Sequence, residues 1–209
     1  MLWLRADIAV GLNGSNVASW GDQSGQANNA TTSNHPTYGT VGGANGQPYL
    51  NFTSVSVQYL GGTSTVTASQ PLEYLIVCRP TASTPATSSY LFDCGMNNNA
   101  MLQGGVGVQL SQYDGIQGNY TTVTQNADIV VDSYFNGASS TLTINNGAVA
   151  GPANTSTASP SGAYTIGNVG SHSAHAWGGY IYEIIVYARQ LLATEKAVIR
   201  AYVLARYGF

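Results

Sequence analysis

The sequence predicts an all-β fold, a two-sheet antiparallel jelly-roll β-sandwich with one C-terminal helix. Two observations carry this prediction. Many short segments of apolar and β-branched residues are separated by turns rich in Gly, Asn, Ser and Thr, which is typical of sandwiches. Residues 193–207 alone place apolar side chains at helical spacing, and Gly208 follows where a helix-capping glycine belongs. We expect Val198, Ile199, Tyr202 and Val203 to pack this helix on the sandwich.

Composition limits the size and the partners of the protein. The chain has 209 residues, 44% of them hydrophobic, which suits a single sandwich domain over residues 1–209. Charged residues make up 7%, against about 25% in an average protein. With six Lys and Arg and a net charge of -3, there is no basic surface for nucleic acid or for an anionic membrane. No apolar run is long enough to span a bilayer, and no signal peptide is evident.

The expected strands follow from composition and alternation. Residues 71–79 and 180–187 are apolar on both faces, so both should be central strands covered on two sides. Residues 21–46 should form one long loop, and strand signals weaken over residues 95–127. Asn145-Asn146-Gly147 predicts a type I′ hairpin turn into residues 148–150. The other expected strands are 2–5, 16–20, 47–53, 57–61, 88–93, 129–135, 140–145 and 163–167.

Several segments also resemble a known family. They are LWLRAD at 2–7, WGDQSG at 20–25, PTY at 36–38, GQPYLNF at 46–52, YFNG at 134–137, 142–147, EIIVYARQL at 183–191, Glu195, Tyr202 and RYG at 206–208. In order and spacing, the chain resembles laminin-G-like domains of phage and bacterial type, in the concanavalin A-like lectin/glucanase superfamily. The resemblance implies a jelly-roll fold, and the superfamily hosts many functions. Family members place a capping residue before the final helix, whereas Thr194 sits beside Glu195 here, so we expect a shifted or frayed helix start.

The Trp20-x-Asp22-x-Ser24-Gly25 segment is the most motif-like feature. Asp22 and Ser24 suit a turn in which side-chain oxygens accept bonds from nearby backbone N–H groups, while Gly25 adopts a positive φ. Trp20 would anchor this loop in the core. The alternative is a calcium ion bound near Asp22, although other carboxylates are scarce nearby. We favour the structural interpretation, and with it no cofactor.

Glu183 is a carboxylate within a strand of apolar residues. A buried carboxylate needs a partner, and Arg5, Arg79 or Arg189 could supply one. A catalytic role is the alternative. The glucanases of the resembled superfamily carry Glu-x-Asp-x-Glu on one strand, and this chain has no such run. Since a glycosidase needs a positioned carboxylate pair, we expect no glycosidase activity and a protein that is not an enzyme.

Aromatic and histidine side chains near loops are the candidates for ligand binding. Tyr113, Tyr120, Tyr164 and Trp177 lie amid Asn and Gln, which suits stacking on a sugar. His172 and His175 share a loop with Trp177, but too few further ligands accompany them to predict a metal site. The alternative is that these aromatic side chains pack in the core or line a protein interface, and the sequence leaves both interpretations open.

Cys78 and Cys94 are expected to be free thiols. If residues 72–79 and 88–93 pair as a hairpin, Cys78 lies opposite Ser89 and Cys94 opposite Glu73. That register separates the two sulfurs by about 17 Å, which no disulfide can bridge.

Two functions are compatible with these observations. The first is a structural protein on the surface of a virion, a capsid decoration or tail-associated subunit of a bacteriophage. It would be made in the host cytoplasm, form a homo-oligomer or attach to coat or tail proteins through loops 95–99 or 172–177. An uncharged Ser-, Thr-, Asn- and Gly-rich surface without an export signal motivates it. The alternative is a carbohydrate-binding, lectin-like module that mediates adhesion to surface glycans.

Overall fold

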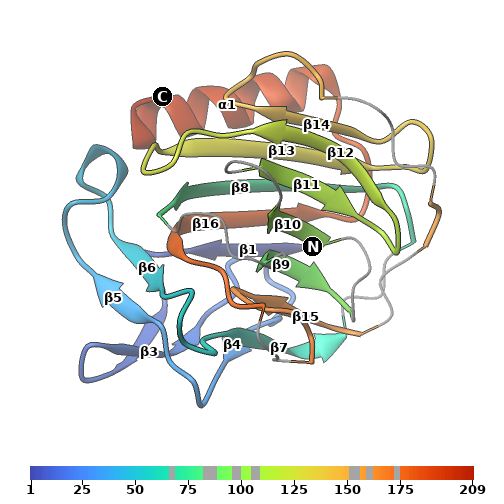
Figure 1. Ribbon diagram of the computed structural model, residues 1–209. Coiled ribbons are helices and arrows are strands. Elements are labelled where there is room, and N and C mark those ends of the chain that lie inside the picture. The colour runs from blue at the N-terminus through green and yellow to red at the C-terminus, as the bar shows by residue number, and fades with distance from the viewer. Residues whose placement is uncertain are drawn as a thin grey trace.

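The computed structural model is a two-layer β-sandwich with a helix on one outer face (Figure 1). It describes residues 1–65, 69–81, 89–95, 100–104, 109–150, 156–158, 162–171 and 175–209. The strands are β1 (Leu2–Arg5), β2 (Val10–Asn13), β3 (Asn16–Trp20), β4 (Ala30–Thr31), β5 (Thr37–Gly39), β6 (Tyr49–Phe52), β7 (Leu60–Thr65), β8 (Leu72–Pro80), β9 (Ser89–Cys94), β10 (Ala100–Gly104), β11 (Gln109–Tyr113), β12 (Gln117–Thr122), β13 (Ile129–Phe135), β14 (Thr141–Ile144), β15 (Ala163–Ile166) and β16 (Gly179–Tyr187). The helices are the 3-10 turn η1 (Ala44–Gly46) and α1 (Ala193–Tyr207). The predicted fold class is therefore confirmed.

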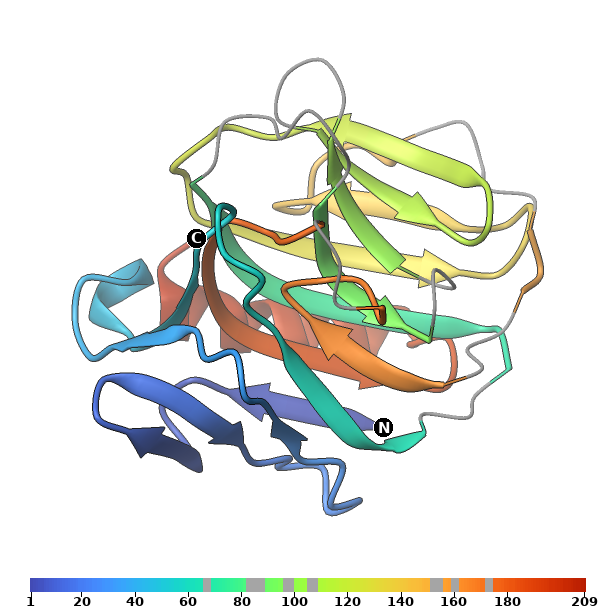
Figure 2. The ribbon, with the colours of Figure 1, turned by 60° about the horizontal axis from the view of Figure 1, so that its bottom comes forward.

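One hydrogen-bonded strand path curls over to make both layers. The back sheet runs β14-β13-β8-β16-β6-β5, and β1 also pairs with β16. The front sheet runs β12-β11-β10-β9-β15-β7-β4-β3, with β2 pairing β3. The named strand pairs of the described chain are antiparallel. Figure 2 shows α1, in red, beyond the back sheet and away from the green strands of the front sheet.

The two central strands of the back sheet have two apolar faces, as the sequence predicts. On β8, Leu72, Tyr74 and Ile76 point into the core between the sheets, while Leu75 and Val77 point outward to α1. Because successive strand side chains alternate between faces, a continuous apolar run is what a doubly covered strand requires. The back sheet therefore carries a core on each side.

Helix α1 begins and ends where the sequence predicts. Glu195 Oε2 accepts a hydrogen bond of 2.8 Å from the backbone N–H of Leu192, and Gly208 closes the helix with φ 85°. The expectation of a shifted or frayed start is wrong, because the helix begins at Ala193. Leu192 is the N-cap and has no side-chain oxygen, so Glu195 alone supplies its half of a capping box. Val198 was also wrongly assigned to the packing face. It is 70% exposed, whereas Val203 is 2% exposed.

The predicted hairpin between Cys78 and Cys94 is wrong, although both thiols are free and buried as expected. Strand β8 pairs with β13 and β16, and β9 pairs with β10 and β15. Both strands are mostly apolar and almost fully buried, so their composition did not identify their partners. Burial raises the pKa of Cys94 to about 12 and raises that of Cys78 as well, which keeps both thiols protonated.

Two turn predictions have different outcomes. Asn145 and Asn146 adopt φ 50° and 59°, as a type I′ turn requires, and Ala150 then forms a bridge to Leu142. The expected loop over residues 21–46 instead contains β4, β5 and η1, whose two or three residues each are too short to give a sequence signal. The loop 95–99 falls largely outside the described residues.

Candidate functional site

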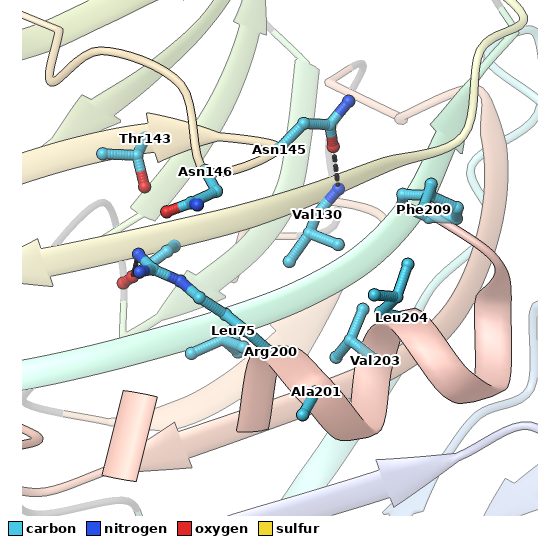
Figure 3. A pocket seen from close by; sticks show the side chains of 11 residues that line it. Leu75, Val130, Thr143, Asn145, Asn146, Arg200, Ala201, Val203, Leu204 and Phe209 are labelled. Atoms are coloured by element: carbon cyan, nitrogen blue, oxygen red, sulfur yellow. Dashed lines mark hydrogen bonds and ion pairs between the residues drawn. The ribbon is translucent and has the colours of Figure 1, made fainter. Parts of the chain in front are cut away.

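A groove of about 250 Å³ lies between α1 and the β13–β14 hairpin, on the outer face of the back sheet (Figure 3). Helix α1 covers the middle of this sheet and leaves the edge at β13 and β14 open beside it. The lining residues come from both sheet strands and helix: Leu75, Val130, Asp132, Thr143, Asn145, Asn146, Arg200, Ala201, Val203, Leu204 and Phe209.

The turn at Asn145 and Asn146, which follows β14, fixes one rim of the groove. Asn145 accepts a 2.8 Å hydrogen bond from the backbone N–H of Val130 through its side-chain oxygen, and its own N–H donates to the carbonyl of Val130 at 2.9 Å. Both turn residues are in the left-handed region, which Asn tolerates better than most residues. The turn is thus clamped on β13, and Asn146 is carried at its exposed tip beside the groove (Figure 3).

The groove has a polar end and an apolar end. Figure 3 shows Thr143, Asn146 and the guanidinium of Arg200 toward one end, and Leu204 and Phe209 toward the other. The apolar floor consists of Leu75, Val130 and Val203, each at most 9% exposed. Thr143 is half-buried, and its hydroxyl oxygen is buried without a hydrogen-bond partner in the described structure. The groove therefore suits a ligand with an apolar part and a hydrogen-bonding part.

Four charged residues set the electrostatics of the polar end. Asp132 lies 3.3 Å from Lys196 and 3.4 Å from Arg200, and Lys196 also pairs with the buried Glu73. Glu73 accepts a further hydrogen bond of 2.6 Å from the backbone N–H of Leu191. Burial is the largest effect on the pKa of Glu73 and raises it above its ordinary value, although Lys196 and the backbone N–H of Leu191 act to lower it. With two carboxylates and two cations, the cluster has no net formal charge.

Arg200 is held more loosely than the other cationic side chains. All six Lys and Arg residues lie in the described part of the chain. Arg5, Arg79, Arg189 and Arg206 make ion pairs of 2.6 to 2.8 Å, and Lys196 is in close contact with Glu73. Arg200 makes a single contact of 3.4 Å and its side chain is 41% exposed. Its guanidinium therefore keeps donors available at the groove.

A second hollow of about 220 Å³ lies on the other side of α1. Its lining is apolar and aromatic: Met1, Trp3, Ile185, Tyr187, Val198, Ile199 and Tyr202. No side chain with a formal charge is part of this lining, so it lacks the pairing of charged donor and acceptor found in the groove.

The front sheet brings three of the residues predicted to bind a ligand onto one outer face. Tyr113 packs against Tyr90, and the ring of His175 meets that of Tyr90 edge-on at 5.7 Å. Tyr120, 47% exposed, lies in register with Ser111 on the next strand. Burial, with Asp93 and Tyr113 nearby, raises the pKa of Tyr90 to about 12. The result is an aromatic patch, which contributes no residue to the groove beside α1 or to the second hollow.

Other predicted ligand residues lie elsewhere. Trp177 and Tyr164 are fully buried in the core between the sheets, where Trp177 meets Phe52 edge-on and Tyr164 stacks on Phe92. Neither ring is therefore exposed for stacking on a ligand. His172 falls outside the described residues.

Asp22 organises the loop that follows β3. Its oxygens accept hydrogen bonds from the backbone N–H groups of Trp3, Ser24 and Asn28 and from the Ser24 hydroxyl, at 2.7 to 3.0 Å. Burial raises the pKa of Asp22, but these donors together lower it below its ordinary value. Trp20 is buried and donates to the carbonyl of Arg5, and Gly25 has φ 80°.

Metal binding was predicted near Asp22 as an alternative. Among the described residues, no group of three or more His, Cys, Asp or Glu is arranged to hold a metal ion. Four donors already face the Asp22 carboxylate, which is the arrangement of a loop-fixing side chain. Calcium binding there stays a prediction.

Glu183 is fully buried, and its predicted arginine partner is wrong. Its carboxylate instead accepts hydrogen bonds from Trp3 Nε1 at 2.6 Å, from the Tyr202 hydroxyl at 2.9 Å and from the Tyr207 hydroxyl at 2.7 Å. Aromatic donors satisfy this carboxylate because β1 and α1 both lie against β16. Sequence patterns missed this, since a Trp or Tyr in an apolar run reads as core.

Comparison with known proteins gives a fold. No family model matches the chain, and no curated protein matches it. An arabinofuranosidase in complex with arabinofuranosyl-α-1,2-xylobiose is 13% identical, with a TM-score of 0.70 over 92% of this chain and 51% of its own. A Trypanosoma rangeli sialidase with the inhibitor DANA is 15% identical, with a TM-score of 0.62 over 95% of this chain and 32% of its own. The binding domain of Paraclostridial Mosquitocidal Protein 1 is 12% identical, with a TM-score of 0.67 over 96% and 52%.

These similarities overturn the prediction that the protein is not an enzyme. That prediction was based on the absence of a Glu-x-Asp-x-Glu run from the sequence. However, the solved structures that share this fold include an arabinofuranosidase and a sialidase. At 12–15% identity the likeness shows the fold alone, so it assigns no activity to this chain. The chain spans about half of the arabinofuranosidase and about a third of the sialidase.

Among the described residues, no helix combines the length and the apolar character that crossing a bilayer demands.

Proposed function

We propose that this chain is a carbohydrate-binding domain of the concanavalin A-like, laminin-G-like type, and that the groove beside α1 is its binding site. The single observation that carries this proposal is the composition of the groove. An apolar floor of Leu75, Val130 and Val203 adjoins a polar end with Thr143 and Arg200.

This combination suits sugars for a physical reason. A pyranose ring has C–H faces that lose water favourably against apolar side chains, and hydroxyl edges that need both donors and acceptors. At the polar end, Arg200 donates, Asp132 accepts, and Asn146 and Thr143 can do both. Arg200 and Asn146 already face solvent at the rim, so they give up little hydration when a sugar hydroxyl replaces water.

The comparisons support the proposal. Two of the structurally similar proteins, an arabinofuranosidase and a sialidase, are named for their action on sugars, and a third is the binding domain of a mosquitocidal protein. The order of motifs that resembles laminin-G-like domains, from residues 2–7 to 206–208, is consistent with the same assignment.

A glycan array followed by calorimetric titration of the bound glycan tests the proposal. Ala201→Trp places a large ring in the groove and is expected to abolish binding. Val198→Trp, on the exposed opposite side of the same helix, is the matched control and should bind as the natural chain does. Circular dichroism and thermal melting would check that both variants fold.

Two outcomes would contradict the proposed site. If Ala201→Trp binds normally while Tyr120→Ala does not, the front aromatic patch is the binding surface. If no glycan binds the natural chain, the carbohydrate-binding function itself is wrong.

The predicted virion surface subunit, with coat or tail proteins as partners, stays a prediction. The described structure contains no feature that favours it over glycan binding. Mass spectrometry of purified particles would test the location, and analytical ultracentrifugation would test the expected homo-oligomer.

A further inference from the structure

The polar end of the groove is selective about the kind of group it can accept. Asp132 offers acceptors and Arg200 offers donors, and the surrounding cluster of Glu73, Asp132, Lys196 and Arg200 has no net formal charge. A carboxylate would only accept hydrogen bonds and would face Asp132, whereas an ammonium would only donate and would face Arg200 and Lys196. The matching ligand group is neutral and both donates and accepts.

The apolar end narrows the ligand further. Leu204 and Phe209 lie toward this end, and Val130 and Val203 form the floor that leads to it (Figure 3). All four side chains are apolar, and the side-chain oxygen of the adjacent Asn145 already accepts from the backbone N–H of Val130, so a hydroxyl placed against them would exchange hydrogen bonds to water for apolar contacts. A methyl group, in contrast, is stabilised when it leaves water for this apolar surface.

Resting on the proposed function, we propose that the groove recognises a neutral sugar bearing an N-acetyl group, with the amide at the polar end and its methyl toward Leu204 and Phe209. An acetamido group is neutral, donates through N–H, accepts through C=O and carries a methyl beside both. Asp132 would accept from the amide N–H, and Arg200 and Thr143 would donate to its carbonyl.

Two features of the free protein support this assignment. The Thr143 side chain lines the groove, and its hydroxyl oxygen is buried without a partner among the described residues. Rotation of this side chain toward the groove would give its O–H an acceptor in a ligand carbonyl. Arg200 has one long contact, so it can turn to the ligand while Asp132 keeps Lys196 at 3.3 Å. The ligand would therefore not leave Asp132 without a cation.

Titration with matched sugars tests the inference. The full chain would be titrated with N-acetylglucosamine against glucose and with N-acetylgalactosamine against galactose, by calorimetry and ligand-observed NMR. We expect the acetylated sugar of at least one pair to bind about tenfold or more tightly than its parent. Saturation transfer should be strongest at the acetamido methyl. Equal affinity within both pairs, or saturation confined to ring protons, would overturn the inference while carbohydrate binding stands.

Variants at the apolar end provide the second arm. Leu204→Asp is expected to weaken the acetylated sugar about tenfold or more, and Val198→Asp to leave its affinity unchanged. Both residues are exposed, at 58% and 70%, so neither change should prevent folding. An unchanged affinity in Leu204→Asp would contradict the inference. Failure of every sugar, on the array and in titration, would overturn the proposed function together with it.

Discussion

The two sides of helix α1 use polar groups in opposite ways. Toward β1 and β16, Tyr202 and Tyr207 donate to a fully buried carboxylate, Glu183, which also holds Trp3. Toward β13 and β14, Arg200 makes one long contact and the Thr143 hydroxyl has none in the described structure. Hydrogen bonds completed inside the protein contribute to stability, whereas donors left at a groove remain available to a ligand. One helix thus fastens the fold on one side and, in the function proposed above, recognises a ligand on the other.

The largest expected effect tests whether the apolar side chains buried between α1 and the back sheet hold the helix in place. Val203→Asp puts a carboxylate at a position that is 2% exposed, and we expect a loss of about 3–5 kcal/mol in the free energy of unfolding. Val198→Asp, on the exposed surface of the same helix, should change it by about 0.5 kcal/mol or less. Urea denaturation followed by circular dichroism measures both. Similar losses in the two variants would show that α1 packs in another orientation.

The next prediction compares the two sides directly. Glu183→Leu leaves Trp3 Nε1, Tyr202 and Tyr207 without their acceptor, and should cost about 2–4 kcal/mol. Arg200→Leu removes one long surface contact and should cost less than about 1 kcal/mol while weakening glycan binding. Denaturant unfolding and titration of both variants would decide this. If Arg200→Leu proved the more destabilising change, the division of roles would be wrong.

Smaller effects are expected in the pH dependence of stability, to which Asp22, beside β1, and Glu73, beside Lys196, should contribute with opposite signs. The pKa of Asp22, which holds the Trp3 backbone, is lowered from 3.8 because its N–H donors outweigh the opposing effect of burial. Its contribution is therefore present above about pH 4 and lost as pH falls below that value. The pKa of Glu73, beside Lys196, is raised from 4.5 by burial, so its contribution is present at low pH and lost as pH rises through the raised pKa.

Melting temperatures between pH 7 and 2.5 check these signs. Asp22→Asn should flatten the loss of stability below pH 4, and Glu73→Gln should flatten the decline on the neutral side of pH 4.5. If Asp22→Asn loses as much stability below pH 4 as the natural chain does, the role assigned to Asp22 is wrong. If Glu73→Gln shows the same decline above pH 4.5 as the natural chain, the role assigned to Glu73 is wrong.

Sequence patterns predicted the fold better than the site. The doubly apolar runs of β8 and β16, the turn at Asn145 and Asn146, and the capping Gly208 each follow from local chemistry, and each was confirmed. Periodicity could not assign Val198, because apolar residues that are neighbours in sequence point in different directions around a helix.

The groove could not be predicted because its residues are remote in sequence. Leu75, Val130 and Arg200 come from three elements that meet through strand pairing and helix packing. The partners of Glu183 were missed for the same reason, since Trp3 is 180 residues away. Local patterns do mark the turn at Asn145 and Asn146, and they place Arg200 and Leu204 one turn apart on α1. Neither pattern shows that this turn and this face of the helix lie opposite each other.

The position of β16 determines when the back sheet can form during synthesis. It is the last strand in the sequence, and it lies at the centre of the back sheet with β8 on one side and β1 and β6 on the other. During synthesis, β1 and one edge of β8 therefore lack their partner until residues 179–187 have left the ribosome. Such long-range pairing slows folding and leaves apolar strand edges exposed. The nascent chain is thus expected to depend on chaperones until its final helix can cover the sheet.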